Sequence, residues 1–590
     1  MAVSRSRPVA LLGMVVIAIA ALLTTACNSS STSSGASSTS SSSAYHLVTP
    51  GDLTIGYYPS VGLLDEVNGQ VAGALVPIDN FIAKYLKLKP VYVEMSFSAM
   101  LPALQSGRID IIGTSIASTE PRAQVAYAEH PMTFIGPETM IIKPGTTLST
   151  WEEAAAKHYT LASVQGYYQI QAWQSLGINV QIFDSNNACM QDVLSGAAFG
   201  CALGPFTLPY LQATDPTNPL AKLIQVDMSG PLVDLDTSTL YVGKDNPALA
   251  WAVDQALTQA WRNGTVADGY REAFDGVSGY KVFLAMPTGG SNIYFPGPWE
   301  AGTYPTPPSN FASVTTISSG TLTVGLTANS PMLSLTGSTL SGPEAKILDY
   351  VAQKMGLSVK GVMVANDASA LNSGQVDVVA GELATTPALT DQFWMTDPIA
   401  FSPDYMYVPI ASDGSYPTYG SWESLTKTGG DIAVVAGSNR IAALQSSGAT
   451  VLTFPTVAAA LGAVADGQAA AFVGTSVDFA STVSATPALQ KAQFQFLQNT
   501  DTYSQGLAYA WGVKAGDGTL VDDLNQAIAL SWINGVTDSA FSSAWPGADV
   551  TALEAPGPSL IGGSSYSSSL VYTEVSMWVS GAWLQQPGMK

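Results

Sequence analysis

The stretch Gly107-Arg-Ile-Asp110-Ile-Ile in the first half of the chain returns as Gly374-Gln-Val-Asp377-Val-Val in the second half. Three further pairs match in the same order and at almost the same offset. They are Leu53-Thr-Ile-Gly56 with Leu322-Thr-Val-Gly325, Trp151-Glu152 with Trp422-Glu423, and Trp261-Arg-Asn263-Gly264 with Trp532-Ile-Asn534-Gly535. Because four matches keep their order at nearly constant spacing, residues 46–285 and 315–550 are interpreted as two copies of one unit, module 1 and module 2.

Each copy alternates short β-branched runs with helical stretches. In module 1 the pattern predicts strands at 53–56, 91–95 and 109–113, and helices at 76–86 and 100–106. Such alternation is typical of parallel sheets covered by helices, with ligands bound at the carboxyl ends of the strands. The fold class is therefore α/β.

The length of each copy favours two lobes. In module 1 we expect lobe 1 over about 46–143 and 235–285, and lobe 2 over about 150–230. The Pro-rich and Gly-rich residues 286–314 form a linker, and residues 551–590 form a tail without an assigned role.

Composition excludes several classes of partner. The 590 residues carry 22 Lys plus Arg against 44 Asp plus Glu, a formal net charge of −22, which repels a nucleic-acid backbone. The chain has three histidines and no HExxH, Cys-x-x-Cys or Gly-x-x-x-x-Gly-Lys pattern. We therefore expect no nucleic acid, no metal and no cofactor.

The segment from Met1 to Cys27 is typical of a targeting signal. Arg5 and Arg7 precede an apolar run from Val9 to Leu23, which is too short to span a bilayer comfortably. The run ends at Thr24-Thr25-Ala26-Cys27, which resembles a bacterial lipobox and implies a lipid on Cys27, although the expected Leu stands one place too early. An ordinary secretory signal is the alternative. The Ser-rich residues 28–45 form a flexible tether, so we expect an exported protein held by lipid at the outer face of the cytoplasmic membrane.

A longer segment carries a family resemblance. Pro102-Ala-Leu104-Gln-Ser-Gly107-Arg-Ile-Asp110, followed by Thr114-Ser115 and Thr119-Glu-Pro-Arg122, resembles the signature of the family 3 extracellular solute-binding proteins, the polar amino acid receptors of ABC importers. In module 2 the resemblance rests on 374–377, 393–398, 437–438 and 524–528. It implies the type II periplasmic-binding-protein fold as two bilobal modules in tandem, a small-molecule solute and an ABC permease as partner.

The resemblance also implies a binding site in module 1. Arg122 would clamp the solute carboxylate, because a planar guanidinium pairs with it bidentately. Hydroxyls of Thr119, Ser115 and Thr114 would assist. The alternative is that Arg122 is a surface residue at a helix start.

Departures from the family pattern narrow the ligand class. Relatives in the family usually hold the ammonium of an amino acid with an aspartate. At that position module 1 has Gly204 and module 2 has Thr475. Binding of a plain amino acid is therefore doubtful unless another carboxylate reaches the cleft. The candidates are Asp184, Asp234 and Asp236. Tyr57, Tyr58 and Tyr167 suggest an aromatic-lined pocket that suits a larger or flatter solute. The alternative is that these tyrosines only pack in the core.

Module 2 departs further, because the segment Thr386-Pro387-Ala388-Leu389 has no arginine. Either it binds a neutral solute through Ser438, Thr385, Thr386 and Trp394, or it has become a structural or docking module. We expect the fold to persist and amino acid binding to be lost.

Two cysteines, Cys189 and Cys201, flank one predicted helix in lobe 2 of module 1. In an oxidising compartment they could form a disulfide, or they could remain two small buried residues.

The expected function is that of a lipid-anchored substrate-binding receptor for an ABC importer, binding a small carboxylate-bearing solute mainly in module 1. Because no nucleophile stands with a base at a recognisable spacing, we expect no enzyme and no catalytic residues. A ligand-sensing or scaffold lipoprotein without transport, and a degenerate enzyme relative of the same fold, remain alternatives.

Overall fold

The computed structural model describes residues 45–553, apart from 136–138, 229–235, 280–281, 284–303, 385–388, 390–391, 402–403, 418, 420–421, 439, 447 and 499–507. Predictions about Cys27, the tether up to residue 44, most of the linker, Thr385, Thr386 and the tail beyond residue 553 lie outside the described residues.

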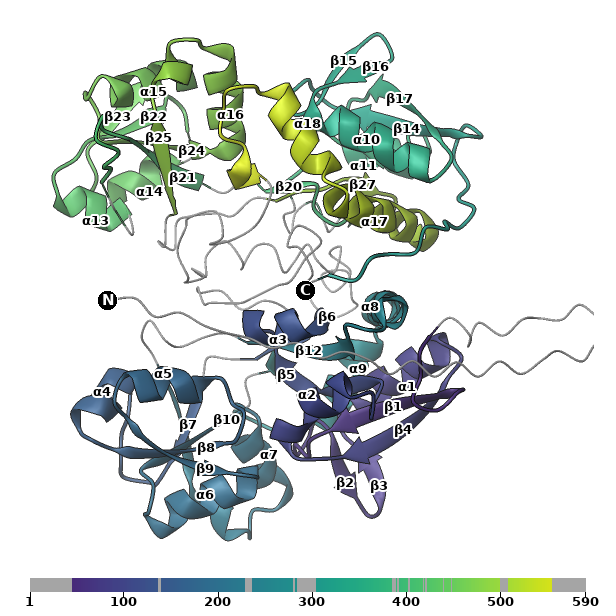
Figure 1. Ribbon diagram of the computed structural model, residues 1–590, viewed down its shortest axis with the longest axis vertical. Coiled ribbons are helices and arrows are strands. Elements are labelled where there is room, and N and C mark those ends of the chain that lie inside the picture. The colour runs from purple at the N-terminus through teal and green to yellow at the C-terminus, as the bar shows by residue number, and fades with distance from the viewer. Residues whose placement is uncertain are drawn as a thin grey trace, which may run out of the picture. The chain divides into compact units, whose positions relative to one another are not determined.

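Module 1 contains two α/β lobes (Figure 1). The sheet of lobe 1 has the order β13-β6-β12-β5-β1-β4. Its strands are β1 (Asp52–Tyr57), β4 (Lys89–Glu94), β5 (Ile111–Ala117), β6 (Ala126–Ile135), β12 (Asp236–Gly243) and β13 (Val282–Phe283). Its helices are α1 (Val76–Tyr85), α2 (Phe97–Gln105), α3 (Glu120–Val125), α8 (Pro247–Arg262) and α9 (Thr265–Ala273), beside the hairpin β2 (Asp65–Val67) and β3 (Gln70–Ala72).

Lobe 2 of module 1 has a sheet in the order β11-β7-β10-β8-β9. The strands are β7 (Thr139–Ile142), β8 (Thr160–Val164), β9 (Asn179–Phe183), β10 (Gly200–Leu203) and β11 (Ile224–Asp227). Around them lie α4 (Trp151–Ala156), α5 (Gln169–Ser175), α6 (Asn186–Ser195), α7 (Thr207–Thr214) and the 3-10 turn η2 (Pro219–Lys222).

Module 2 repeats this plan. The first sheet, β17-β14-β18-β27-β19, contains β14 (Thr321–Leu326), β17 (Ser358–Met363), β18 (Val378–Val379), β19 (Trp394–Met395) and β27 (Gly512–Val513). It is accompanied by α10 (Pro343–Lys354), α11 (Asp367–Asn372), α17 (Gly518–Ile533), α18 (Val536–Ala544), η4 (Thr551–Leu553) and the hairpin β15 (Ser334–Thr336) and β16 (Thr339–Ser341). A separate two-stranded ladder joins β20 (Ala400–Phe401) to β26 (Ala508–Tyr509).

The second sheet of module 2 runs β23-β22-β24-β21-β25. Its strands are β21 (Asp404–Pro409), β22 (Ile432–Val435), β23 (Val451–Phe454), β24 (Ala471–Thr475) and β25 (Phe494–Gln498). Its helices are α13 (Trp422–Lys427), α14 (Arg440–Ser446), α15 (Val457–Ala465), α16 (Ser476–Ala485) and the 3-10 turn η3 (Leu489–Lys491).

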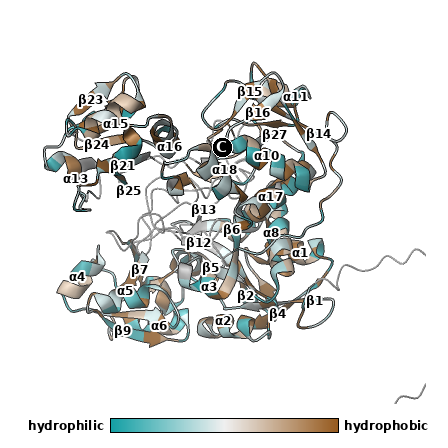
Figure 2. Cartoon of the chain, turned by 45° about the horizontal axis from the view of Figure 1, so that its top comes forward, coloured by the Kyte–Doolittle hydropathy of each residue, from teal (hydrophilic) through white to brown (hydrophobic). Residues whose placement is uncertain are grey.

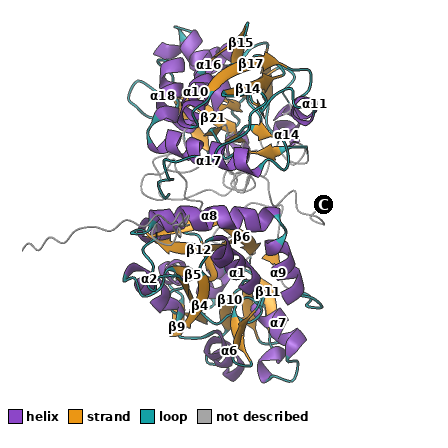
Figure 3. Ribbon diagram, turned by 90° about the vertical axis from the view of Figure 1, so that its right-hand side faces the viewer, coloured by secondary structure: helices purple, strands orange, loops and turns teal. Residues whose placement is uncertain are grey.

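The predicted βαβ arrangement is present in the first lobe of both modules. Strand β1 pairs in parallel with β4 and β5, and β14 pairs in parallel with β17 and β18. The strands β12 and β6, by contrast, run antiparallel to their neighbours, and α8 lies along them (Figure 3).

The repeated aspartate explains the motif that defines the modules. Asp110 accepts hydrogen bonds from the backbone N–H of Val48 and Thr54 at 2.8 and 2.6 Å. Asp377 does the same for Ile317 and Thr323 at 2.8 and 2.7 Å. Each carboxylate therefore fixes the chain that enters the first strand of its module.

The cores follow the hydrophobic pattern of the repeat. Leu53 and Leu322, on the first strand of each module, are fully buried, and Trp261 and Trp532 are 1% and 4% exposed. Helix α10 bears hydrophilic as well as hydrophobic residues (Figure 2), and its apolar side joins the core. In the part of the chain that the structure describes, no helix combines the length and the apolar character needed to cross a bilayer.

A disulfide joins Cys189 to Cys201, with Cα atoms 5.8 Å apart. The expectation that both residues flank a helix is wrong for Cys189, which lies inside α6, while Cys201 lies on β10. Helix α6 begins before Cys189, at Asn186, because the side chain of Ser185 caps it by accepting a hydrogen bond from the N–H of Ala188.

Candidate functional site

Arg122 connects the two lobes of module 1. It lies on α3 and is 9% exposed, so it is not the surface residue of the alternative interpretation. Its Nη1 donates to the carbonyl of Ala117 at 2.8 Å, and its Nη2 donates to the carbonyl of Gly166 at 3.2 Å. Ala117 ends β5 in lobe 1 and Gly166 follows β8 in lobe 2. The guanidinium therefore lies in the cleft between the carboxyl ends of these strands.

A cluster of three aromatic rings contacts this guanidinium through Phe97. The Cζ atom of Arg122 lies 5.5 Å from the ring centre of Phe97, close enough for a cation–π contact. Phe97 meets Tyr58 edge to face at 5.8 Å and Tyr167 at 4.9 Å. Tyr58 and Phe97 belong to lobe 1 and Tyr167 to lobe 2, so the rings close the cleft from both sides.

The prediction that Tyr57 lines the pocket is wrong. Its hydroxyl donates to Glu94 at 3.5 Å, its ring meets Tyr92, and it belongs to the core of lobe 1. Side chains alternate along a strand, so the neighbours Tyr57 and Tyr58 point to different sides. Only the second one reaches the cleft.

Asn186, the first residue of α6, gathers the two cleft tyrosines. The hydroxyl of Tyr58 donates to its Oδ1 at 3.1 Å and accepts from its N–H at 2.9 Å. The hydroxyl of Tyr167 donates to the same Oδ1 at 3.4 Å. Burial raises the pKa of Tyr58 to about 12 and raises the pKa of Tyr167 as well, so both phenols stay protonated and can donate.

The predicted hydroxyls have different surroundings. Thr114 is buried and donates to the carbonyl of Tyr58 at 3.3 Å, so it supports the loop after β1. Thr119 precedes α3, and its carbonyl accepts from the N–H of Arg122 at 3.1 Å while its side chain makes no capping bond. Ser115 is half-buried on β5.

Among the three alternative carboxylates, Asp184 lies near the cleft. It is exposed, and its negative charge contributes to the raised pKa of Tyr58. Asp234 and the side chain of Asp236 lie outside the described residues.

Sequence reasoning missed Phe97 and Asn186. Phe97 stands at the start of α2, where only the apolar periodicity of the helix was visible. Asn186 follows the N-cap Ser185, a position that indicated a helix start and not a contact with the other lobe.

Module 2 places its predicted residues differently. Leu389, which stands at the position of Arg122 in the repeat, packs against the hydrophobic core of the first lobe. Trp394 lies on β19 and packs against a core cluster, so its proposed role as a solute contact is not favoured. The hydroxyl of Ser438 accepts from Arg440, through the N–H at 3.2 Å and Nη1 at 3.5 Å.

A carboxylate replaces a hydroxyl in module 2. Glu382 occupies the position that Ser115 has in module 1, and it adopts a positive φ of 59°. It accepts from the N–H of Met332 at 3.2 Å. Burial raises its pKa, and the negative charge of Asp478, on α16 of the second lobe, raises it further. Two acidic groups therefore lie near each other where module 1 offers a hydroxyl.

Glu344 holds the loop that carries Glu382. It accepts from the N–H of Gly381 at 3.0 Å, of Glu382 at 3.4 Å and from Nε1 of Trp511 at 2.9 Å. Burial raises its pKa to about 7, although these three bonds oppose the shift.

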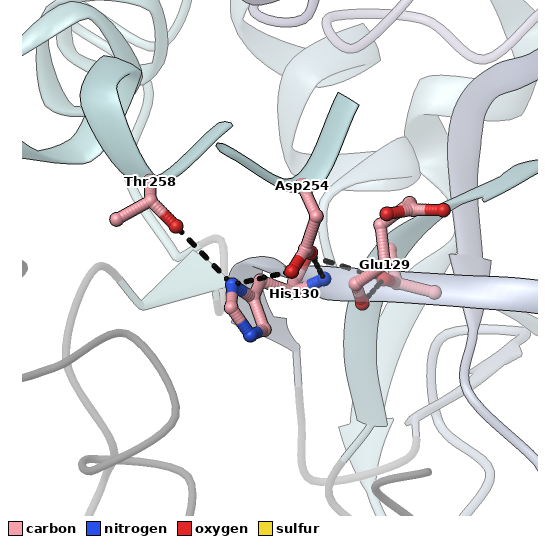
Figure 4. A network of polar contacts seen from close by, with 5 residues as sticks. Glu129, His130, Asp254 and Thr258 are labelled. Carbon is pink, nitrogen blue, oxygen red and sulfur yellow. Dashed lines mark hydrogen bonds and ion pairs between the residues drawn. The ribbon is translucent and has the colours of Figure 1, made fainter. Parts of the chain in front are cut away.

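A buried polar network connects β6 and α8 in lobe 1 of module 1 (Figure 4). Asp254 accepts from the N–H of His130 at 2.8 Å, and its other oxygen lies 3.3 Å from Nδ1 of the same histidine. Thr258 Oγ1 is 3.2 Å from that Nδ1. Burial raises the pKa of Asp254 and of Glu129 beside it.

This network is not a catalytic triad. Thr258 and Asp254 both approach Nδ1, whereas a triad histidine contacts the nucleophile and the acid through different nitrogens. Module 2 has a comparable bond from the N–H of Asp397 to Asn525 at 2.8 Å, which indicates a structural cap. Among the described residues, no group of three or more His, Cys, Asp and Glu could hold a metal ion.

The model of the bacterial extracellular solute-binding proteins, family 3, matches residues 53–276 and 322–541. The chain belongs to this family. Both modules of this family 3 protein therefore are solute-binding domains of the type II periplasmic fold, and they are related to amino-acid-binding periplasmic proteins.

Curated relatives of the family 3 protein match over part of their length. The Probable amino-acid-binding protein YxeM of Bacillus subtilis (strain 168) is 24% identical over 133 residues, 22% of this chain and 50% of the relative. The Lysine/arginine/ornithine-binding periplasmic protein of Escherichia coli (strain K12) is 24% identical over 135 residues, 22% of this chain and 51% of the relative. The chain thus spans about half the length of the curated relatives it matches.

Solved structures match over nearly their whole length. An ancestral arginine-binding protein bound to arginine is 24% identical, with a TM-score of 0.34, and the match covers 38% of this chain and 98% of that chain. The P235GK mutant of ArgBP from T. maritima is 21% identical, with a TM-score of 0.34, and covers 38% of this chain and 95% of that chain.

Proposed function

We propose that this protein is the substrate-binding receptor of an ABC importer, held by a lipid on Cys27 at the outer face of the cytoplasmic membrane. It captures a small carboxylate-bearing, amino-acid-like solute mainly in module 1. The proposal includes the division of the chain into a signal, a tether, two modules joined by a linker, and a tail. The observation that carries it is the buried Arg122 between the two lobes.

The guanidinium of Arg122 is suited to a carboxylate. Its partners are backbone carbonyls, which carry only partial charge, so a full carboxylate is the better acceptor. Ser118, directly after Ala117, adds a buried hydroxyl whose Oγ makes no hydrogen bond within the described part of the chain. Such a group is satisfied when a solute accepts from it.

The rings of Tyr58, Phe97 and Tyr167 suit the remainder of the solute. Aromatic faces bury apolar or flat groups, and these three rings pack edge to face with one another. Asp184 supplies the nearby negative charge that an ammonium would need.

Module 2 is less suited to the same solute. Leu389 stands in place of the guanidinium, and Glu382 stands in place of a hydroxyl, with Asp478 nearby. A carboxylate entering this cleft would meet like charges, which disfavours its binding. We therefore keep a neutral solute or a docking role for module 2.

A ligand-sensing or scaffold role without transport would use the same cleft as a transport role. The partner protein, a permease or another membrane protein, therefore decides between transport and sensing. An enzyme of the same fold would need a nucleophile and a base, and the His130 network does not supply that pair.

The test is a thermal-shift screen of the full chain against amino acids, opines, small peptides and sugars. A solute that binds only the native state raises the apparent melting temperature. We expect carboxylate-bearing solutes to raise it, and Arg122→Ala to reduce the rise at the same solute concentration. A rise that only sugars produce and that Arg122→Ala leaves intact would contradict the proposal. Copurification of an ABC permease then separates transport from sensing.

A further inference from the structure

Lysines gather at one end of lobe 1 in module 1. Lys84, Lys87 and Lys89 are three of the 22 Lys plus Arg residues of the chain and stand within six positions. No acidic residue stands between Asn80 and Val91. All three lysines are exposed, and within the described part of the chain none of them forms an ion pair with a carboxylate. We propose that this lysine patch docks on the anionic headgroups of a membrane surface and turns this end of lobe 1 toward the bilayer.

The patch lies where the chain enters module 1. The N–H of Lys89 donates to the carbonyl of Gly51 at 3.0 Å, and Lys89 lies opposite Asp52 in the parallel pairing of β4 with β1. Gly51 comes six positions after Tyr45, the first described residue, so the two are at most about 20 Å apart. The tether predicted for residues 28–45 therefore ends near the patch. The lipid anchor of the proposed function would hold this end of lobe 1 close to the membrane, and to that extent the docking rests on the proposed function.

An aromatic pair adjoins the lysines. Tyr85, next to Lys84 on α1, is 47% exposed, and its ring stacks on that of Phe81 at 6.4 Å. Tyrosine is enriched at the boundary between membrane and water, because its ring is apolar and its hydroxyl is polar. Positive charge beside an exposed tyrosine suits a layer of anionic headgroups.

The fold does not require these lysines. At the corresponding positions module 2 has Gln353, Gly356 and Ser358, and the same stretch keeps Lys354 and Lys360 but adds Asp349. Lys87 adopts a positive φ of 59°, where Gly356 has a φ of 72°. A lysine is disfavoured relative to glycine in this left-handed conformation, so stability alone favours the glycine of module 2. The module that follows the tether has a lysine there instead.

The charge of the whole chain does not prevent this docking. A formal net charge of −22 repels an anionic surface, but at 0.1 M salt screening restricts the repulsion to charges within about 10 Å. The charges nearest the headgroups therefore decide. Each lysine close to such a surface strengthens the association about 5-fold, so three of them contribute about 100-fold. This gain orients a module that the tether already holds near the membrane.

The experiment attaches the chain to vesicles without relying on Cys27. The chain from residue 28, which contains both modules complete, carries an N-terminal His tag bound by a nickel-chelating lipid. A fluorophore on Asn80→Cys, an exposed position one turn from Lys84, reports contact with nitroxide-labelled headgroups through quenching. Cys189 and Cys201 form a disulfide and take no label.

We expect quenching at low salt on vesicles that contain phosphatidylglycerol, and little quenching on phosphatidylcholine alone. Replacing all three patch lysines with glutamine should lower the ratio of docked to undocked chain about 100-fold. Lys87→Gly alone, which the left-handed conformation favours, should lower it about 5-fold. This second variant covers the case in which the triple variant fails to fold.

The matched control replaces Lys222, Lys360 and Lys491 with glutamine, which removes the same charge from exposed positions elsewhere and should leave the quenching unchanged. Equal quenching on both kinds of vesicle, or parent-like quenching in the patch variants, would overturn the membrane surface and leave the patch to a protein partner. An equal loss in the control would show a general charge effect and would overturn the patch as well. Because the His tag supplies the attachment, a failure of lipidation at Cys27 would not alter any of these results.

Discussion

Replacing Arg122 with alanine should weaken solute binding to module 1 by about 10- to 150-fold. In the structure the guanidinium donates to the carbonyls of Ala117 and Gly166. In the proposed site, a solute carboxylate would take over the donor now used by Gly166 and gain a second N–H, since a guanidinium offers five donors. The net gain is one charge-assisted bond, about 1.5 to 3 kcal/mol, which corresponds to that loss of affinity.

Isothermal titration calorimetry on the full chain, with the solute that the thermal-shift screen selects, measures this loss. Arg122→Lys keeps the charge without the planar fork and should fall between the parent and alanine. Leu389→Ala, at the corresponding position of module 2, is the control and should change the dissociation constant less than threefold. A parent-like dissociation constant for Arg122→Ala would refute the site. If the binding heat disappeared with Ser438→Ala instead, module 2 would hold the working site and a neutral solute would be indicated.

Three further predictions concern stability and localisation. Replacing Cys189 and Cys201 with alanine opens a loop with a sequence separation of 12 and should lower the free energy of unfolding by about 3 kcal/mol, measured by denaturant titration against the oxidised parent; equal midpoints would refute this. Because the pKa of Glu344 rises from 4.5 to about 7 on folding, its contribution to stability is complete below pH 4.5 and is lost as the pH rises to about 7. The loss amounts to roughly 3 kcal/mol, and Glu344→Gln should remove this pH dependence in denaturation measured from pH 4 to 8. Finally, Cys27→Ala should release the protein from membranes into the medium, and fractionation that finds it still membrane-bound would contradict the anchor.

The fold could be predicted from the sequence because its signals are local or repeated. The β-branched runs and helical stretches of module 1 lie where β1, α1, β4, α2 and β5 are found. The Gly-x-x-Asp motif repeats because Asp110 and Asp377 make the same pair of backbone bonds in each module. Because the unit occurs twice in the chain, an element predicted in one module has a counterpart in the other.

The cleft was only partly predictable, because it forms from contacts that no local pattern encodes. A local motif predicts Arg122, but its partner Gly166 is 44 positions away in the other lobe. Tyr58 and Asn186 are separated by 128 positions. The sequence shows Tyr57 and Tyr58 only as two adjacent tyrosines, whereas the strand directs them to different sides.

The differences between the modules concentrate at the cleft. Positions that build the fold keep their residue type, as Trp261 and Trp532 do in the two cores. Positions that face the cleft of module 1 change together, and the corresponding pairs are Arg122 with Leu389, Ser115 with Glu382, Tyr58 with Thr327 and Asn186 with Val457. Each change removes a donor, an acceptor or a ring, or introduces a negative charge, whereas none disturbs a core. If stability were the only constraint, core positions and cleft positions would change to a similar extent. Because only the cleft positions change their chemistry, this pattern favours a difference in ligand chemistry between two modules of one fold.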